Sequence, residues 1–404
     1  MKSFAFLVVM TALLVGCPGA AGQVQDSSAP CGEIVMSDAQ LVECVRHEAE
    51  AWLQLAPFED GQGRQGLAIH SFPDGPQQLM ERTYLYDQAL ALLWFSWLGE
   101  YETASRLATT LVALQMEDGA WGFSFEARED GFYDQGYVRT GAVAWAGWAL
   151  SYYGTWAGDV EALEAAEGAR AYIESTRVEK NSTEADQFYA AGVGHHDPNT
   201  GERILGEPVE FVSTEHQFDV HKFFRAHRAS AQAGLRERIL EKLWIGDEGR
   251  FAMGVQAQGV DRRRALDTSG GWGALWLLSV DRPDLARKSL EYTVENFSVS
   301  GASFEGGFAP YLDAVDGYDP QQEVIFVEGS LGVALAALRL DKPQITKDVL
   351  KMSAVLAEKD DGGIPYADRS LGDFVENSAA APTLWFLMVE RELNTGRRAP
   401  LFLP

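Results

Sequence analysis

The sequence predicts an all-α fold, a closed (α/α)6 toroid of six helical hairpins, from three observations. After Ser37 the hydrophobic pattern is helical almost everywhere, and strands are scarce. Helices that are apolar on all sides alternate with amphipathic ones, which predicts an inner and an outer layer. Short inner-to-outer loops alternate with long outer-to-inner loops. This recurrence indicates a repeat architecture; the alternative, an open α-solenoid, has shorter repeats and a weaker alternation.

The N-terminal segment is expected to lie outside the fold. Lys2 precedes an apolar run, residues 4–15, which is too short to span a bilayer and is typical of a secretory signal. The run ends in Leu13-Leu14-Val15-Gly16-Cys17, which resembles the lipobox of bacterial lipoproteins. That resemblance implies cleavage before Cys17, lipid attachment at Cys17, and export to the bacterial cell envelope, on its periplasmic or extracellular face. An ordinary signal peptide cut near residues 16–22 is the alternative.

Three segments are therefore predicted: a signal peptide at 1–16, a flexible tether at 17–36, and the toroid domain at 37–404. Cys31 and Cys44 are the remaining cysteines, and an isolated pair in an exported protein is more often bridged than free. Such a bond would pin the tether to the first helix. We expect a monomer that meets the membrane only through its lipid anchor.

The outer helices are predicted at Ser37–Ala56, Glu102–Glu117, Asp159–Val178, Gly234–Trp244, Pro283–Phe297 and Pro343–Glu358. The inner helices are predicted to begin near Thr83, Arg139, Thr214, Asp267, Val327 and Asn377. All inner helices start on the long-loop face, so the positive ends of their dipoles converge on one cavity. Thr214 and Gln217 are predicted to form a capping box, and Asp267 an N-cap.

The residues at the inner-helix starts and in the long loops should line this cavity. Carboxylates interleaved with exposed aromatic rings suit sugars, whose apolar faces stack on Trp and Tyr while acids bind the hydroxyls. The predicted substrate-binding residues are Tyr86, Trp121, Tyr133, Arg139, His216, Asp219, Asp267, Trp272 and Tyr311. The net charge of −26 would repel a polyanion, so no nucleic-acid partner is expected.

The twelve-helix pattern resembles the six-hairpin glycosidase superfamily, which includes glycoside hydrolases, polysaccharide lyases and sugar epimerases. Residues 83–90, 140–146 and 326–329 resemble the inner-helix starts of its bacterial members. The likeness covers nearly all of the chain after Ser37, but no catalytic motif of a single family is matched. It implies a carbohydrate substrate more firmly than a particular reaction.

Glycoside hydrolysis requires two carboxyls across the scissile bond. Glu215, Asp87 and Glu328 are the predicted catalytic residues, because each lies in or near the first turns of an inner helix. Acids at such positions also stabilise the helix dipole by about 0.3–1 kcal/mol, so capping is the alternative role of each. A glycoside hydrolase is the preferred hypothesis.

Other activities remain open. Epimerases and isomerases of this fold use histidines for proton transfer, and His216 is placed to bond Asp219. A lyase of the same fold and a glycan-binding lipoprotein without catalysis are further alternatives. Residues 114–122 resemble the QW repeat of squalene-cyclase-type toroids, but the DxDD acid motif is missing. No cofactor or metal is predicted, since the spacing of His195, His196, His216 and His221 fits no standard zinc pattern.

Overall fold

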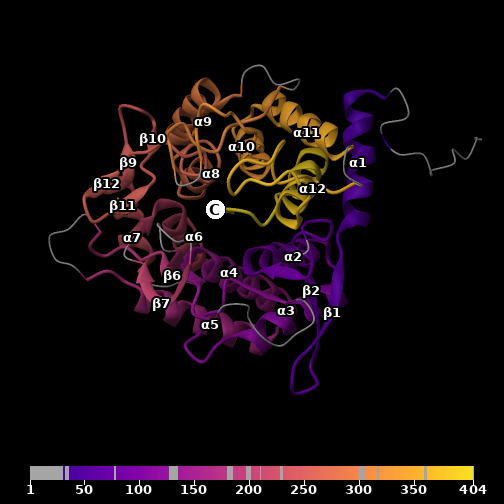
Figure 1. Ribbon diagram of the computed structural model, residues 1–404, viewed down its shortest axis with the longest axis vertical. Coiled ribbons are helices and arrows are strands. Elements are labelled where there is room, and N and C mark those ends of the chain that lie inside the picture. Colours follow the sequence, from indigo (N-terminus) through magenta and orange to yellow (C-terminus); the bar gives the residue numbers. More distant parts are fainter. Residues whose placement is uncertain are drawn as a thin grey trace, which may run out of the picture.

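The computed structural model describes residue 31 and residues 36–76, 79–126, 135–179, 185–196, 202–209, 211–227, 231–299, 305–315, 318–358 and 362–403. In this part of the chain, helices form an inner and an outer layer around a ring (Figure 1). The inner helices are α2 (Leu85–Leu98), α4 (Thr140–Ala157), α6 (Thr214–Ala226), α8 (Trp272–Ser279), α10 (Val327–Arg339) and α12 (Ala380–Thr395). The outer helices are α1 (Asp38–Trp52), α3 (Tyr101–Leu114), α5 (Val160–Ser175), α7 (Gln232–Arg238), α9 (Pro283–Phe297) and α11 (Pro343–Ala357).

The inner layer closes on itself. Each inner helix packs on the next one in sequence, and α12 packs on α2, which completes the ring. Most side chains of the inner helices are buried, whereas outer helices such as α3 and α9 bury one stripe. The all-α (α/α)6 toroid predicted from the alternation of helix types is therefore confirmed.

Several predicted element ends are wrong, each for a local reason. The first helix stops at Trp52 rather than Ala56, because Pro57 disfavours helical backbone before it and the chain enters β1. The outer helix α7 is short and continues as a π-helical turn at Ile239–Leu243. The helix predicted to begin near Asp267 begins at Trp272, after a turn containing two consecutive glycines.

Strands are scarce within the two helical layers, as predicted, but the segments that connect the helices contain many. The strands are short: β1 (Leu55–Glu59), β2 (Gln65–Ile69), β3 (Arg82–Tyr84), β4 (Ser124–Glu126), β5 (Val138–Arg139), β6 (Gly192–His196), β7 (Arg203–Val209), β8 (Val212–Ser213), β9 (Trp244–Ile245), β10 (Arg250–Phe251), β11 (Gly254–Gln256) and β12 (Gly259–Asp261). They form small antiparallel sheets ordered β1-β2, β3-β4, β5-β6-β7, β12-β11-β8 and β10-β9. Apart from β9 and β10, which follow α7 at the rim, these sheets build the long loops.

The start of each inner helix is anchored by backbone pairing to the loop that leads to the next inner helix. Strands β3, β5 and β8, which directly precede α2, α4 and α6, pair with β4, β6 and β11. Before α8 and α10 the pairing is a single bridge, Ala265–Tyr311 and Phe326–Ala367 respectively. At α12 the Ala380 amide donates to the Ser71 carbonyl at 2.9 Å, and this bond closes the circle. The helix mouths are thus held in one continuous backbone ring.

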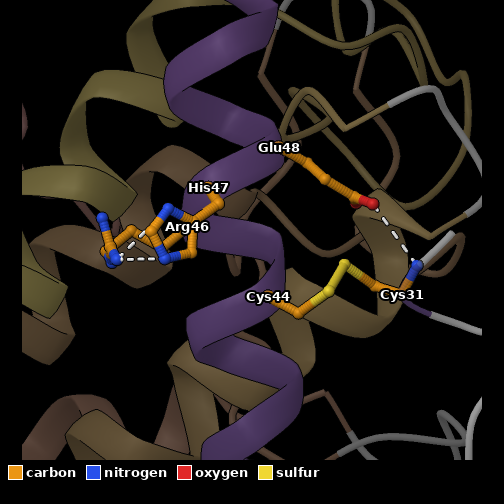
Figure 2. Close-up of a disulfide and its surroundings, with 5 residues drawn as sticks. All are labelled: Cys31, Cys44, Arg46, His47 and Glu48. Carbon is orange, nitrogen blue, oxygen red and sulfur yellow. Dashed lines mark hydrogen bonds between the residues drawn. A yellow bond between two sulfur atoms is a disulfide. The ribbon is translucent and has the colours of Figure 1, made fainter. Parts of the chain in front are cut away.

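A disulfide joins Cys31 to Cys44 of α1, as the cysteine count favoured (Figure 2). The Cys31 amide also donates to Glu48 at 3.3 Å, and α1 packs on α11 and α12. The bond therefore fixes residue 31 to the outside of the ring. Cys17, the signal segment 1–16 and most of the tether 17–36 lie outside the described residues. Among the described helices, none is long and apolar enough to cross a membrane.

The C-terminal segment enters the ring from the short-loop face, and Figure 1 shows the C-terminus at the ring centre. We call residues 399–403 the plug. Arg339, the last residue of α10, donates to the carbonyls of Ala399 at 3.1 Å and Leu401 at 2.6 Å, and it pairs with Glu392 at 2.8 Å. Leu401 and Phe402 are buried. The plug thus closes the ring opposite the long loops.

Candidate functional site

A cavity of about 390 Å³ opens at the long-loop face, where the inner helices begin. Its acids come from three successive inner-helix regions: Glu215, Asp219, Asp267 and Glu328. Its aromatic residues are Tyr86, Phe123, Trp145, Trp272, Tyr311, Phe326, Tyr366 and Phe374. The volume lies at the lower end of the range of about 300–1,000 Å³ for small-molecule sites.

The local sequence explains how the acids reach the cavity. Glu215 and Glu328 each occupy the second position of an inner helix, α6 and α10, so both lie at a positive dipole end. Asp219 follows Glu215 by four residues, which places both on one face of α6. Asp267 lies in the turn before α8, between these two helices.

The predicted cap structures at two of these helices are wrong. At α6 the N-cap is Ser213, whose hydroxyl accepts from the His216 amide at 3.4 Å. Gln217 instead donates to the Tyr189 carbonyl and accepts from the Tyr189 amide, which anchors α6 to the segment between α5 and β6. Asp267 is not an N-cap either, since α8 begins five residues later. The carboxyl of Asp267 is consequently available to the cavity.

Burial and crowding raise the pKa of every acid in this group. Removal from water raises the pKa of Glu215, and it raises the pKa of Glu328 to about 8. The pKa values of Asp219 and Asp267 are raised well above their usual range by burial first, and then by the negative charge of Glu215. Four acids that repel one another therefore share protons at neutral pH, as general acid–base chemistry requires.

Glu328 belongs to a hydrogen-bonded chain that links the neighbouring inner helices α10, α12 and α2. Tyr86 of α2 donates to Glu328 Oε1 at 2.7 Å, and Trp385 Nε1 of α12 donates to the Tyr86 hydroxyl at 2.7 Å. Because the Tyr86 hydroxyl accepts from Trp385, its single proton is directed at Glu328. The carboxyl of Glu328 is consequently oriented, and its second oxygen has no protein partner among the hydrogen bonds of the described residues.

Several polar atoms of the cavity wall lack a hydrogen-bond partner within the described part of the chain. They are His216 Nδ1, Asp219 Oδ1, Asp267 Oδ1 and Trp272 Nε1. A buried polar atom left unpaired costs about 1–3 kcal/mol, so such atoms normally meet water or a ligand. Donors and acceptors at one cavity match the mixed donor and acceptor character of a hydroxyl-rich molecule.

His216 and Arg139 form the side of the cavity next to α4. Burial, with the nearby Arg139 charge, lowers the pKa of His216 to about 4, so the imidazole is neutral at pH 7. Gly141 permits this approach: a Cβ there would lie 2.5 Å from His216 Cδ2 and 3.1 Å from Asp219 Oδ2. Arg139 is held by the carbonyls of Val193 at 3.0 Å and Gly194 at 2.9 Å.

Most of the predicted site residues meet at this cavity. Those that line it are Tyr86, Arg139, Glu215, His216, Asp219, Asp267, Trp272, Tyr311 and Glu328. Asp87 does not: it is buried on α2 near Ser71, and burial raises its pKa to about 7. Trp121 is fully buried in the core, where Nε1 donates to the Leu111 carbonyl at 2.8 Å. Tyr133 lies outside the described residues.

Sequence reasoning missed Trp145, Phe326 and Phe374 as cavity residues. The position of Trp145 could have indicated a cavity residue, because it lies within the first turns of an inner helix, as Glu215 and Tyr86 do. Among the described side chains, neither His195 nor His221 joins His216 in a metal site, and the side chain of His196 lies outside the described residues. His195 pairs with Glu207 at 3.9 Å on β6 and β7, and His221 accepts from Trp276 in the core at 3.2 Å.

No protein-family model matches the chain, and no curated protein matches its sequence. Solved structures match over most of its length. A glycosidase variant in complex with glucose has a TM-score of 0.59 at 13% identity, over 91% of this chain and 98% of that one. Cellobiose 2-epimerase from Bacillus thermoamylovorans has 0.59 at 12% identity, over 87% and 100%. A D-mannose isomerase has 0.61 at 11% identity, over 88% and 97%. These likenesses show the fold.

Proposed function

We propose that this chain is a carbohydrate-active enzyme and that it hydrolyses glycosidic bonds with Glu215 and Glu328 as its catalytic carboxyls. The observation that carries the proposal is one small aromatic-walled cavity into which two glutamates project from the first turns of α6 and α10. The structural neighbours, which include a glycosidase in complex with glucose, two epimerases and an isomerase, support the substrate class.

The surroundings of the two glutamates assign their roles. Glu328 is 5% exposed and has a pKa of about 8, so at pH 7 it holds the proton that a general acid gives to the leaving oxygen. Glu215 keeps more contact with the open cavity, at the positive end of α6, and is the ionised partner. As the bond to the anomeric carbon breaks, the Glu215 carboxylate either deprotonates a water molecule or attacks that carbon.

The aromatic residues supply the sugar-binding walls. Trp145 and Tyr86 lie edge to face with ring centroids 5.2 Å apart, and Trp272 packs on Trp385 at 5.1 Å. Side chains that are fixed by their neighbours offer flat apolar surface at low entropic cost. The carboxyls and the unpaired Trp272 Nε1 can then bind the hydroxyls at the edges of the sugar ring.

The test is a pair of amide substitutions assayed on a panel of aryl glycosides and short oligosaccharides. Glu215→Gln and Glu328→Gln should each lower kcat by about three or more orders of magnitude while sugar binding, measured by calorimetry, persists. Asp87→Asn is the matched control: this buried acid lies outside the cavity wall and acts on Glu328 only through its charge, so the change should leave kcat within about tenfold. If the two glutamine variants keep wild-type turnover, the assignment is wrong.

A sugar epimerase or isomerase is the second candidate, favoured by one observation. His216 is a neutral imidazole at the cavity wall with Nδ1 unpaired, which suits it to remove a proton from carbon. Solvent deuterium separates the two reactions, since an epimerase or isomerase that works by proton transfer introduces deuterium into the carbon skeleton and a hydrolase does not. Loss of all turnover in His216→Gln, with deuterium uptake in the wild type, would favour this second reaction.

We also propose, from the sequence pattern alone, that Cys17 carries a lipid and that the toroid is displayed on the bacterial cell envelope. Export agrees with the disulfide between Cys31 and Cys44, which persists in oxidising compartments. Metabolic labelling with a radioactive fatty acid should mark the wild type and not Cys17→Ser. Equal labelling of both forms would contradict the proposal.

A further inference from the structure

Lys222 is a buried cation beneath the candidate site. It lies on α6, one turn beyond Asp219, and is 5% exposed. Its ammonium has no hydrogen-bond partner among the described residues. Instead Nζ lies 3.0 Å from the ring centroid of Trp145, 4.6 Å from that of Phe402 and 5.6 Å from that of Trp148. Three aromatic rings therefore surround one ammonium group.

The aromatic rings alone do not offset the cost of burying the Lys222 ammonium, so the ammonium needs a further favourable interaction. Burying an ammonium costs several kcal/mol, and a desolvated cation–π contact returns only about 2 kcal/mol. A methionine of similar length would fill the same space without that cost. The missing stabilisation can come from Asp219, three residues earlier on the same face of α6, whose negative charge favours the protonated form of Lys222.

The plug completes the cage and is itself held firmly. Phe402 packs edge-on against Trp145 with centroids 5.9 Å apart. Its φ of +46° lies in the left-handed region, which costs a non-glycine residue about 1–3 kcal/mol and persists only where the surroundings impose it. Arg339 imposes it through the carbonyls of the plug, and Trp148 Nε1 donates to the Pro400 carbonyl at 3.3 Å.

Trp145 connects the cage to the cavity. One face of its ring receives Lys222, its indole lies near enough to Asp219 to lower the pKa of that carboxyl, and the ring lies edge to face with Tyr86, the residue that orients Glu328. The titratable groups facing Asp219 are Glu215, His216 and Lys222 of α6, Asp267 before α8, and Tyr86 of α2. Lys222 is the only cation in this set.

We propose that Lys222 is a positioning residue: caged by the plug, it supplies the counter-charge of Asp219 and so allows Glu215, one turn away, to ionise as base or nucleophile. This inference rests on the proposed function. Without Lys222 the Asp219 charge is uncompensated, and two like charges at i and i+4 oppose each other's ionisation. Burial lowers the pKa of Lys222 to about 7, and the negative charge of Asp219 opposes this shift by favouring the ammonium form.

The test compares Lys222→Met, which keeps length and removes charge, with Lys222→Arg, which keeps charge. In Lys222→Met the acidic limb of the kcat/KM profile should move to higher pH by about one unit, within the 1–3 units that a nearby opposite charge provides. Lys222→Arg should restore the limb at least in part. Phe402→Leu, which shortens one wall of the cage, should move the limb in the same direction by less.

A uniform loss of activity in Lys222→Met with an unchanged pH profile would overturn the inference and leave a purely structural role. A readout without turnover separates this outcome from failure of the proposed function. Carbon-13 NMR of labelled carboxyl groups, with the Asp219 signal identified by its loss in Asp219→Asn, should show a higher titration midpoint in Lys222→Met than in wild type. An unchanged midpoint refutes the inference even if no glycoside is cleaved, and Phe402→Leu serves if Lys222→Met does not fold.

Discussion

The protonation states of the carboxyls in the cavity follow from the surroundings of each side chain. Glu328 is deeply buried and bonded by Tyr86, whereas Glu215 borders open space at the end of α6. Two carboxyls with different surroundings lose their protons at different pH values, which is how one site holds an acid and a base together. The roles assigned to Glu328 and Glu215 therefore predict the pH dependence of turnover.

We expect a bell-shaped kcat/KM profile with its optimum near neutral pH. Glu328 acts protonated, so activity should fall as the pH rises through its pKa of about 8. Glu215 acts ionised, so activity should fall as the pH drops through a pKa raised above the ordinary value of 4.5. Initial rates from pH 4 to 10 measure both limbs. An optimum near pH 4, typical of unperturbed carboxyls, would contradict the assignment.

Gly141 is predicted to be irreplaceable where α4 meets α6. An added Cβ would lie 2.5 Å from His216 Cδ2, so Gly141→Ala must displace the imidazole or the helix. We expect a loss of about 1–3 kcal/mol in the free energy of unfolding and lower activity. Urea unfolding and rate measurements test both. Gly234→Ala on α7 is the control, because no atom lies within 4 Å of its Cβ; it should be neutral or stabilising by up to about 1 kcal/mol.

At the scale of elements, the disulfide fastens the start of the chain to α1. Cys31 and Cys44 are 13 residues apart, and closing a loop of this size in the unfolded chain is worth up to about 3 kcal/mol. Cys31→Ser should lower the free energy of unfolding by about that amount at most. Because wild type under reducing conditions lacks the same bond, its stability should then match the variant. A difference that survives reduction would point to lost side-chain packing instead.

The helices could be predicted from the sequence because burial leaves a clear pattern. Inner helices are apolar on all sides and outer ones on one stripe, and α9 was placed to the residue at Pro283–Phe297. Ends set by loop contacts could not be placed this way. Gln217 looked like half of a capping box, yet it bonds the backbone of Tyr189, which is distant in sequence.

From the sequence, the site residues that could be predicted are mainly those at the starts of the inner helices. Residues in the first turns of inner helices, such as Glu215, Glu328 and Tyr86, reached the cavity. Asp87 does not line the cavity, because its neighbour Tyr86 faces the cavity and successive helical residues point about 100° apart. Trp121 is buried in the core and does not reach the cavity. An indole in a long loop can occupy either place, and the local sequence does not distinguish a core position from a cavity position.

At the scale of the whole molecule, the ring of backbone pairs links every helix mouth to the next. The last link, from the Ala380 amide to the Ser71 carbonyl, can be removed selectively. Ala380 is the first residue of α12, where proline is tolerated since the helix needs no amide there. We expect Ala380→Pro to cost about 1 kcal/mol in the free energy of unfolding. Ala380→Val, which adds bulk but keeps the amide, is the control, and equal losses in both would show that bulk alone matters.

That closing bond also has a consequence for how the protein is made. Ser71 and Ala380 come from opposite ends of the domain, so the first and last inner helices cannot meet until nearly the whole chain has left the ribosome. Until then α2 exposes the apolar surface that α12 later covers. Contacts of such long sequence separation form slowly. The nascent chain should therefore depend on a holding chaperone until synthesis is complete, and a truncation before α12 should aggregate rather than fold.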